Sequence, residues 1–176
     1  EDDRSPSLYD LLTKGEFIEK AIKKTSIPNL DIITSTKDLA ASEIELVEVE
    51  NRESRLKNIL DKISGYDYFF IDCPPALGLL TINGLVSASS VIVPLQCEFF
   101  ALEGLSALTN TIKSIKQTFN PKLEIEGVVL TMHDKRNSLS ELVENDVRSF
   151  LETKFTKQLF REMSKFLKPP AMESQC

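Results

Sequence analysis

The sequence has few of the residues that build metal sites or disulfide frameworks. Its 176 residues include three cysteines, one histidine and no tryptophan. The cysteines, at positions 73, 97 and 176, are far apart and form no C-x-x-C pair. This spacing favours reduced thiols over disulfides or a zinc site. Because His133 stands alone, a histidine-based triad or metal centre has almost nothing to draw on.

An excess of positive charge and a long apolar run are also missing. The net charge is −6, so no global basic field attracts nucleic acid or anionic lipid, and any DNA contact must be a local patch. No apolar run reaches the roughly 20 residues that a membrane span needs, and no signal peptide opens the chain. We therefore expect a cytoplasmic protein without a membrane partner. The composition, 41% hydrophobic and 27% charged, is that of a globular domain.

The glycines do not form a phosphate-binding loop. The six glycines are scattered, and G-K-[ST] occurs nowhere in the sequence. The absence of G-x-G-x-x-G disfavours an oxidoreductase on a dinucleotide-binding fold. Since the first residue is Glu1 and not Met, we expect the chain to begin downstream of a start codon.

The apolar pattern predicts helices that alternate with strands. Residues 7–24 are predicted as two short helices on either side of Gly15, 27–35 as a turn and a strand, and 37–49 and 51–64 as helices. The remaining predicted elements are strands at 66–72, 91–95 and 125–131 and helices near 78–89, 101–118 and 138–151. The order predicts an α/β fold, in which these last three strands are consecutive rungs of a parallel sheet with helices on both faces.

Polar or turn-forming residues follow each of these three strands. They are Asp72-Cys73-Pro74-Pro75, the run from Pro94 to Glu98, and the run from Thr131 to Asp134. Ligands of open parallel sheets bind outside the carboxyl ends of the strands, so we expect the chemistry at this edge. The aspartate after the first strand allows two interpretations. It either begins a turn or caps the next helix, or it is a hard anion that holds Mg²⁺.

Three segments follow one another in the sequence: YDYFFIDCPPALGLLTINGL (66–85), VIVPLQCEFFALEGLSALTNTI (91–112) and IEGVVLTMHDKRNSLSELVENDVR (125–148). In this order, they resemble the ParA/Soj family of chromosome-partitioning ATPases, deviant Walker ATPases that include MinD. The similarity begins at SLYDLL (7–12) and continues to about residue 152. It implies a three-layer, P-loop NTPase-like parallel sheet that is incomplete at its N-terminal end.

The resemblance also implies roles for individual residues. Asp72 corresponds to the Walker B aspartate, which holds Mg²⁺ through water, and Pro74, Pro75 and the 76–80 turn to the switch that responds to the γ-phosphate. The other implied positions are Gln96 and Glu98 near the nucleotide and dimer face, Thr131 and Met132 towards the base, and Lys135, Arg136 and Arg148 on the DNA-binding surface. The alternative is that Gln96 and Glu98 only end a strand and that the three cations are ordinary solvated charges.

The implied activity requires elements that this sequence does not contain. Family members bind ATP and Mg²⁺, dimerise, bind non-specific DNA and are stimulated to hydrolyse ATP by a ParB-type partner protein. Their ATPase activity depends on a KGGVGKT loop and on a D-x-D-P-Q element, and neither occurs here. We therefore expect a core that is truncated at its N-terminus and binds no nucleotide by itself. The alternative is a non-catalytic interaction protein or the product of a decayed gene.

The last residues depart from the family pattern. We expect residues 1–153 to be the ATPase core and 154–176 to be a tail that does not belong to it. The family continues with a segment like VYKTVIPRNVKISEAPSHGKP, whereas this chain has KFTKQLFREMSKFLKPPAMESQC. With suitable synonymous codons, a one-base shift of reading frame converts the second segment into the first. We therefore predict a frameshifted tail, whose residues Leu159, Phe160, Phe166 and Leu167 contribute little to the core.

Overall fold

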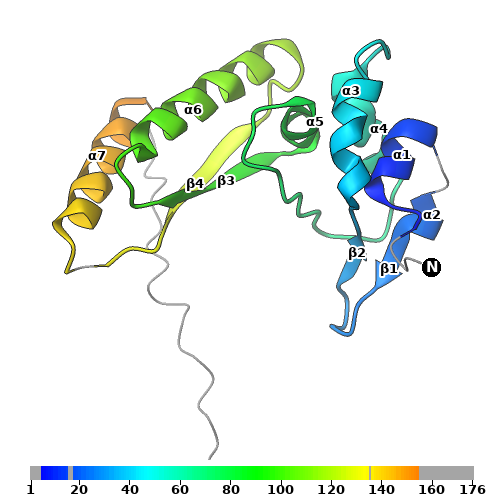
Figure 1. Cartoon of the computed structure of the whole chain (residues 1–176), viewed down its shortest axis with the longest axis horizontal. Helices are drawn as coiled ribbons and strands as arrows, with labels where there is room; N and C mark the ends of the chain where they lie inside the picture. The colour runs from blue at the N-terminus through cyan, green and yellow to red at the C-terminus, as the bar shows by residue number, and fades with distance from the viewer. Residues whose placement is uncertain (1–4, 16–17, 135, 155–176) are drawn as a thin grey trace, which may run out of the picture. The chain divides into compact units, whose positions relative to one another are not determined.

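The computed structural model describes residues 5–15, 18–134 and 136–154, and helices alternate with strands only from α5 (Leu79–Ser87) onward (Figure 1). These residues form two units. The first runs to Ala88 and includes Gln117–Pro121, and the second comprises Ser89–Lys116 and the described residues from Lys122 onward. The predicted α/β class with a parallel sheet is confirmed. Among the described residues, no helix is long and apolar enough to cross a membrane.

The first unit opens with two helices and a short hairpin. Helix α1 (Leu8–Lys14) ends at Gly15, whose left-handed backbone (φ 68°) suits a residue without a Cβ. Helix α2 (Ile18–Ala21) leads into strand β1 (Ile22–Lys24), which pairs antiparallel with β2 (Asp31–Ile33). The prediction that the helices extend to residue 24 is therefore wrong at 22–24. A strand is stabilised by its partner, and the local pattern does not reveal that partner.

Short helices complete the first unit and enclose two apolar clusters. The helices are η1 (Lys37–Ala41), α3 (Ser42–Glu45), η2 (Arg52–Ser54), α4 (Arg55–Leu60) and α5 (Leu79–Ser87). The predicted helices at 37–49 and 51–64 are thus shorter and partly 3₁₀. Leu11 of α1 belongs to the cluster formed with Ile18 and Ala21, and Leu12 to the cluster formed with Leu46 and Leu56. Helix α1 therefore contributes neighbouring leucines to both clusters.

The predicted strand at 66–72 is not formed. These residues have no strand pairing, and Tyr68 and Phe70 are exposed. Ile71 alone packs against the cluster around Leu12, Leu46 and Leu56. The prediction is wrong because density of apolar residues indicates burial, whereas a strand also needs a neighbour for its backbone hydrogen bonds.

The second unit contains the parallel pair of strands. Strand β3 (Ser90–Gln96) pairs with β4 (Glu124–Thr131), with Val93 opposite Val128 and both side chains buried. Helix α6 (Ala101–Thr118) lies between them in sequence, and α7 (Ser138–Lys154) follows β4. All four elements lie where the sequence predicts them. The buried residues of α6 form one helical stripe: Ala101, Leu105, Thr109, Ile112 and Ile115.

Candidate functional site

The carboxyl ends of β3 and β4 bring two of the predicted site residues together. Gln96, the last residue of β3, lies opposite Thr131, the last residue of β4. Beyond Gln96 the chain turns sharply, because the backbone N–H of Glu98 donates to the Gln96 carbonyl oxygen at 2.9 Å. The parallel register thus places the amide of Gln96, the hydroxyl of Thr131 and the turn that carries Glu98 at one edge of the sheet.

The chain leaves β4 through a strained residue. Met132 has a left-handed backbone (φ 54°), which is unusual for a residue with a large side chain, and it is 82% exposed. Two residues later, the backbone N–H of Asp134 donates to the hydroxyl of Ser140, which is buried at the start of α7. This bond anchors the turn that Met132 begins.

Two of the predicted cations lie beside carboxylates. Arg148 Nη2 is 2.7 Å from Glu144 Oε1, and this guanidinium holds the pKa of the Glu144 carboxyl below its usual range. His133 Nε2 lies 3.0 Å from the other oxygen of Glu144, a close contact without hydrogen-bond alignment. The backbone N–H and the guanidinium of Arg136 lower the pKa of Asp134. Lys135 lies outside the described residues.

Asp72 and Pro74 lie in the first unit, in an exposed turn that ends at helix α5. The hydroxyl of Thr81, in the first turn of α5, donates to the carbonyl oxygens of Ala76 at 2.6 Å and Pro74 at 3.3 Å. The side chain of Thr81 therefore ties the proline turn to the helix that follows it.

Cys73 contacts the same helix at Gly84. A Cβ at position 84 would lie 2.7 Å from the Cys73 sulfur and 3.5 Å from Ile71 Cγ2, so only glycine fits without displacement. Cys73 as a residue is exposed, but its sulfur faces the helix. Partial burial of the sulfur raises the pKa of the thiol, and the charge of Asp72 raises it further. The sulfur is therefore held against α5, and its raised pKa disfavours the thiolate form.

The N-terminus of α5 is occupied by a carboxylate from another element. Glu43 Oε1, in α3, accepts a hydrogen bond from the backbone N–H of Leu80 at 3.1 Å. The sequence motifs predict no role at this site for Glu43, Thr81 or Gly84. A glycine inside an apolar helical pattern signals close approach of another segment, so Gly84 could have been found. Nothing local marks Glu43, because its partner is 37 residues away.

The described residues do not by themselves fit Mg-ATP. They contain no group of three or more His, Cys, Asp or Glu side chains that could hold a metal ion. Asp72 offers one carboxylate, and Mg²⁺ bound through one or two carboxylates also relies on the phosphates. The helix N-terminus nearest to Asp72 in sequence, that of α5, already has Glu43 as its anion. The start of α5 is therefore not free to bind a phosphate.

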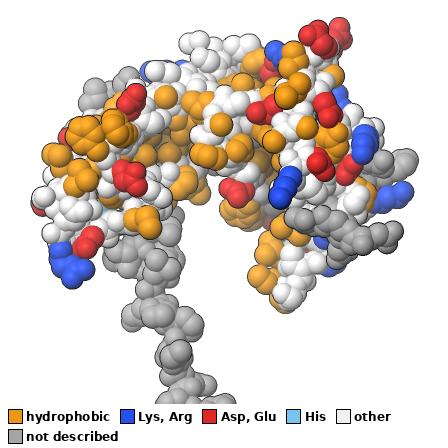
Figure 2. Space-filling view, viewed as in Figure 1, with side chains coloured by type: hydrophobic (Ala, Val, Ile, Leu, Met, Phe, Trp, Pro, Cys, Tyr) orange, Lys and Arg blue, Asp and Glu red, His pale blue; other side chains and the backbone are white. Residues whose placement is uncertain are grey.

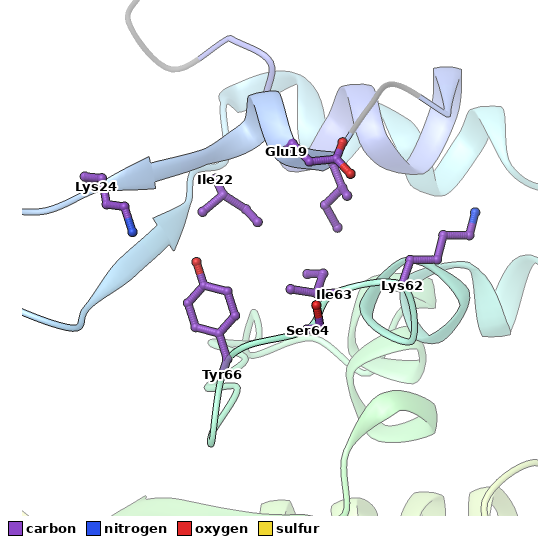
Figure 3. Close-up of a pocket in the computed structure, with 8 residues that line it drawn as sticks. Glu19, Ile22, Lys24, Lys62, Ile63, Ser64 and Tyr66 are labelled. Atoms are coloured by element: carbon purple, nitrogen blue, oxygen red, sulfur yellow. The ribbon is translucent and has the colours of Figure 1, made fainter.

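A shallow cavity of about 350 Å³ lies elsewhere in the first unit (Figure 3). Ile18, Ile22 and Ile63 supply apolar walls, and Tyr66 reaches up towards the β1–β2 hairpin. The Tyr66 hydroxyl donates to Asp31 at 2.5 Å, and Asp31 also pairs with Lys24 at 2.7 Å. The Tyr66 hydroxyl, the Asp31 carboxylate and the Lys24 ammonium group on this side of the cavity therefore bond to one another.

Comparison with known proteins identifies the family. A family model described as an AAA domain matches residues 1–125. The chain is 50% identical over 149 residues to the chromosome partitioning protein ParA of Caulobacter vibrioides, which is 83% of this chain and 56% of that protein. It is 47% identical over 151 residues to the sporulation initiation inhibitor protein Soj of Bacillus subtilis, which is 85% of this chain and 60% of that protein. The chain belongs to the ParA/Soj family.

Solved structures agree with this membership. The ParA/Soj chain matches a cobyrinic acid a,c-diamide synthase from Mycobacterium smegmatis, determined with a bound ATP analogue and magnesium, with a TM-score of 0.78 and 37% identity. This match covers 84% of this chain and 61% of that one. A plasmid partition protein from Borrelia burgdorferi matches with a TM-score of 0.70 and 25% identity over 89% of this chain and 62% of its own. The chain spans somewhat more than half the length of these relatives.

Proposed function

We propose that this chain is the core of a partitioning ATPase of the ParA/Soj type. In the whole protein, Mg-ATP drives dimerisation, the dimer binds non-specific DNA, and a ParB-type partner stimulates hydrolysis. The observation that carries the proposal is the 50% identity over 149 residues to a chromosome partitioning protein. The similarity to a structure determined with an ATP analogue and magnesium supports the choice of nucleotide and metal.

The proposal gives Asp72 the role of holding Mg²⁺ through water. Pro74 and the turn after it would form the switch that responds to the γ-phosphate. Three contacts hold this turn in a defined position. These contacts are the Thr81 hydroxyl, the Glu43 carboxylate at Leu80 and the Cys73 sulfur against Gly84. A switch must be held in a defined position before a ligand can shift it, so this bracing is consistent with the role.

The roles of the remaining residues are inferred from their positions at or after the carboxyl ends of β3 and β4. Gln96 and Glu98 are proposed for the nucleotide and dimer face, and Thr131 and Met132 for the base. The proposed DNA surface consists of Lys135, Arg136 and Arg148. Because Arg136 and Arg148 lie beside Asp134 and Glu144, DNA phosphates would compete with these carboxylates for the guanidinium groups. Because cations that contact phosphates release counterions from DNA, we also expect DNA binding to weaken as salt rises.

By itself, the 176-residue chain should bind no ATP. Backbone N–H groups and a lysine around the phosphates supply several charge-assisted hydrogen bonds, each worth roughly 1.5–3 kcal/mol, and the sequence has no loop of this kind. In calorimetry with Mg-ATP, we expect no saturable heat for the wild-type chain or for Asp72→Ala. Saturable binding that Asp72→Ala abolishes would show that the phosphate site is complete without the loop.

A second experiment separates this proposal from a non-catalytic interaction protein or a decayed-gene product. A relative's N-terminal segment that carries KGGVGKT is joined in frame to residues 1–153, and ATP hydrolysis is measured with DNA and a ParB-type partner. Hydrolysis that Asp72→Ala abolishes supports the ATPase. A folded fusion that binds partner but no nucleotide supports the interaction protein instead.

A further inference from the structure

The proline turn, residues 74–77, depends on a side chain for its hydrogen bonds. Pro74 and Pro75 have no backbone N–H to donate. None of the four residues forms a backbone–backbone hydrogen bond with any other residue that the structure describes. The carbonyl oxygens of Pro74 and Ala76 instead accept from the Thr81 hydroxyl, at 3.3 Å and 2.6 Å. This one hydroxyl therefore connects the turn to helix α5.

Thr81 is buried, although its side chain is polar. Figure 2 shows hydrophobic side chains at the surface in several places, whereas only 5% of Thr81 is exposed. A buried hydroxyl is unfavourable unless it has a hydrogen-bond partner, and Thr81 finds its partners in the turn. The hydroxyl and both carbonyl groups belong to one continuous segment, residues 74–81. The interaction is therefore specified locally and requires no other element.

The helix that carries Thr81 is itself fixed within the first unit. The buried amide of Asn83 accepts from the backbone N–H of Leu56 at 3.1 Å and donates to the Arg52 carbonyl oxygen at 2.9 Å. At the other end of α5, the Asn120 amide donates to the carbonyl oxygen of Ala88 at 2.7 Å. Helix α5 is thus bonded to η2 and α4, and the Thr81 hydroxyl connects the turn to this anchored helix.

The bonds of Thr81 differ from those that a helical threonine usually makes. Such a hydroxyl commonly donates to a carbonyl oxygen three or four residues earlier in its own helix, as that of Thr109 does to Leu105 in α6. The partners of Thr81 are five and seven residues earlier, and both precede the start of α5 at Leu79. The hydroxyl therefore acts on the turn and not on its own helix.

We propose that Thr81 is a positioning residue for the γ-phosphate switch, and that its hydroxyl sets the place of residues 74–76 relative to α5. The inference rests on the proposed function, which assigns the switch to this turn. Thr81 does not need to touch nucleotide or metal, since it acts through the carbonyl groups of Pro74 and Ala76. Without the hydroxyl, the turn occupies its working position for a smaller fraction of the time, and catalysis falls with that fraction.

The first test uses the 176-residue chain and measures backbone order parameters by NMR relaxation. Thr81→Val keeps the shape of the side chain and removes the hydroxyl, whereas Thr81→Ser keeps the hydroxyl. We expect the order parameters of Ala76 and Leu77 to fall from about 0.85 to about 0.6 or below in Thr81→Val, and to keep their wild-type values in Thr81→Ser. Thr109→Val is the matched control, because it removes a buried hydroxyl that bonds within α6.

The second test uses the fusion that carries KGGVGKT and separates kcat from KM. We expect Thr81→Val to lower kcat at least about threefold and to change KM less than about twofold, because the phosphate loop supplies most of the nucleotide binding. Thr81→Ser should restore at least about half of the wild-type kcat, and Thr109→Val should leave both constants unchanged.

The outcomes separate this inference from the proposed function. A hydrolysing fusion in which Thr81→Val keeps the wild-type kcat would overturn the inference, as would equal losses in Thr81→Val and Thr109→Val or no rescue by Thr81→Ser. Unchanged order parameters in the 176-residue chain would overturn it as well. If the wild-type fusion hydrolyses no ATP, the proposed function has failed, and the order parameters alone then decide whether Thr81 holds the turn.

Discussion

The carboxylate of Glu43 accepts a hydrogen bond from the backbone N–H of Leu80, at 3.1 Å, and so caps a helix in another part of the first unit. Leu80 is the second residue of α5, where the N–H groups have no partner within the helix. A carboxylate at this end also interacts favourably with the helix dipole. The segment around Glu43 therefore stabilises the start of α5.

Loss of this cap should lower the free energy of unfolding. We expect Glu43→Ala to cost about 1 kcal/mol, and Glu43→Gln to cost less because its amide oxygen still accepts the bond. Denaturant unfolding of the three proteins gives the comparison. Equal stability of Glu43→Ala and wild type would contradict the prediction.

Gly78 provides a double-mutant test of the same contact. A Cβ at position 78 would overlap Glu43 Oε1, so Gly78→Ala should displace the carboxylate. The cost of Gly78→Ala should therefore be smaller when Glu43 is already alanine, which a cycle of four unfolding measurements reveals. Additive costs would indicate that Gly78 acts independently of the cap.

Gly84 should resist substitution, although it lies inside a helix. Alanine normally stabilises a helix interior by up to about 1 kcal/mol, but here its Cβ would press on the Cys73 sulfur. We expect Gly84→Ala to destabilise the chain by about 1–3 kcal/mol, as overpacking does, and Cys73→Ala to restore part of the loss. Thermal or denaturant unfolding measures both effects.

Gly104 of α6 is the matched control. A Cβ there meets nothing within 4 Å, so Gly104→Ala should be neutral or stabilising. If Gly84→Ala and Gly104→Ala behaved alike, the contact between Cys73 and Gly84 would have no energetic weight.

The cap of α1 should make stability depend on acid pH. The Asp10 carboxylate accepts hydrogen bonds from the Lys14 ammonium group and from the backbone N–H and hydroxyl of Ser7. These bonds lower the pKa of the Asp10 carboxyl to about 2. Since the folded pKa lies below the unfolded value, the stabilisation is complete above about pH 4 and is lost as the pH falls towards 2.

The difference in unfolding free energy between wild type and Asp10→Asn measures this effect. It should be roughly constant from neutral pH to about pH 5 and shrink below pH 4. A difference that does not change with pH would rule out the carboxylate as its source.

The tail prediction concerns residues that, apart from Lys154 at the end of α7, lie outside the described part of the chain. We propose that 154–176 is encoded out of frame, so the genomic sequence should read as VYKTVIPRNVKISEAPSHGKP after a one-base shift near codon 154. Sequencing of the locus from genomic DNA decides this. Codons that cannot be re-read in this way would make the tail a divergent segment of its own.

The amino-acid sequence by itself determined the helices and strands that are specified by the local spacing of their apolar residues. The long apolar stripe of α6 and the β-branched residues of β3 and β4 predicted these elements. The polar residues after the two strands predicted the edge at which Gln96 and Thr131 lie. The order of its motifs also indicated the ParA/Soj family. These features are local or follow from chain order, so they can be seen without coordinates.

Only the tertiary structure decided where pairing and capping partners lie. Residues 66–72 have a strand-like composition but no partner strand among the described residues, whereas the helix-like residues 22–24 pair with 31–33. The contact from Glu43 to Leu80 joins residues far apart in the sequence. Each of these depends on the free energy of a hydrogen bond between two segments, which neither segment's own sequence contains.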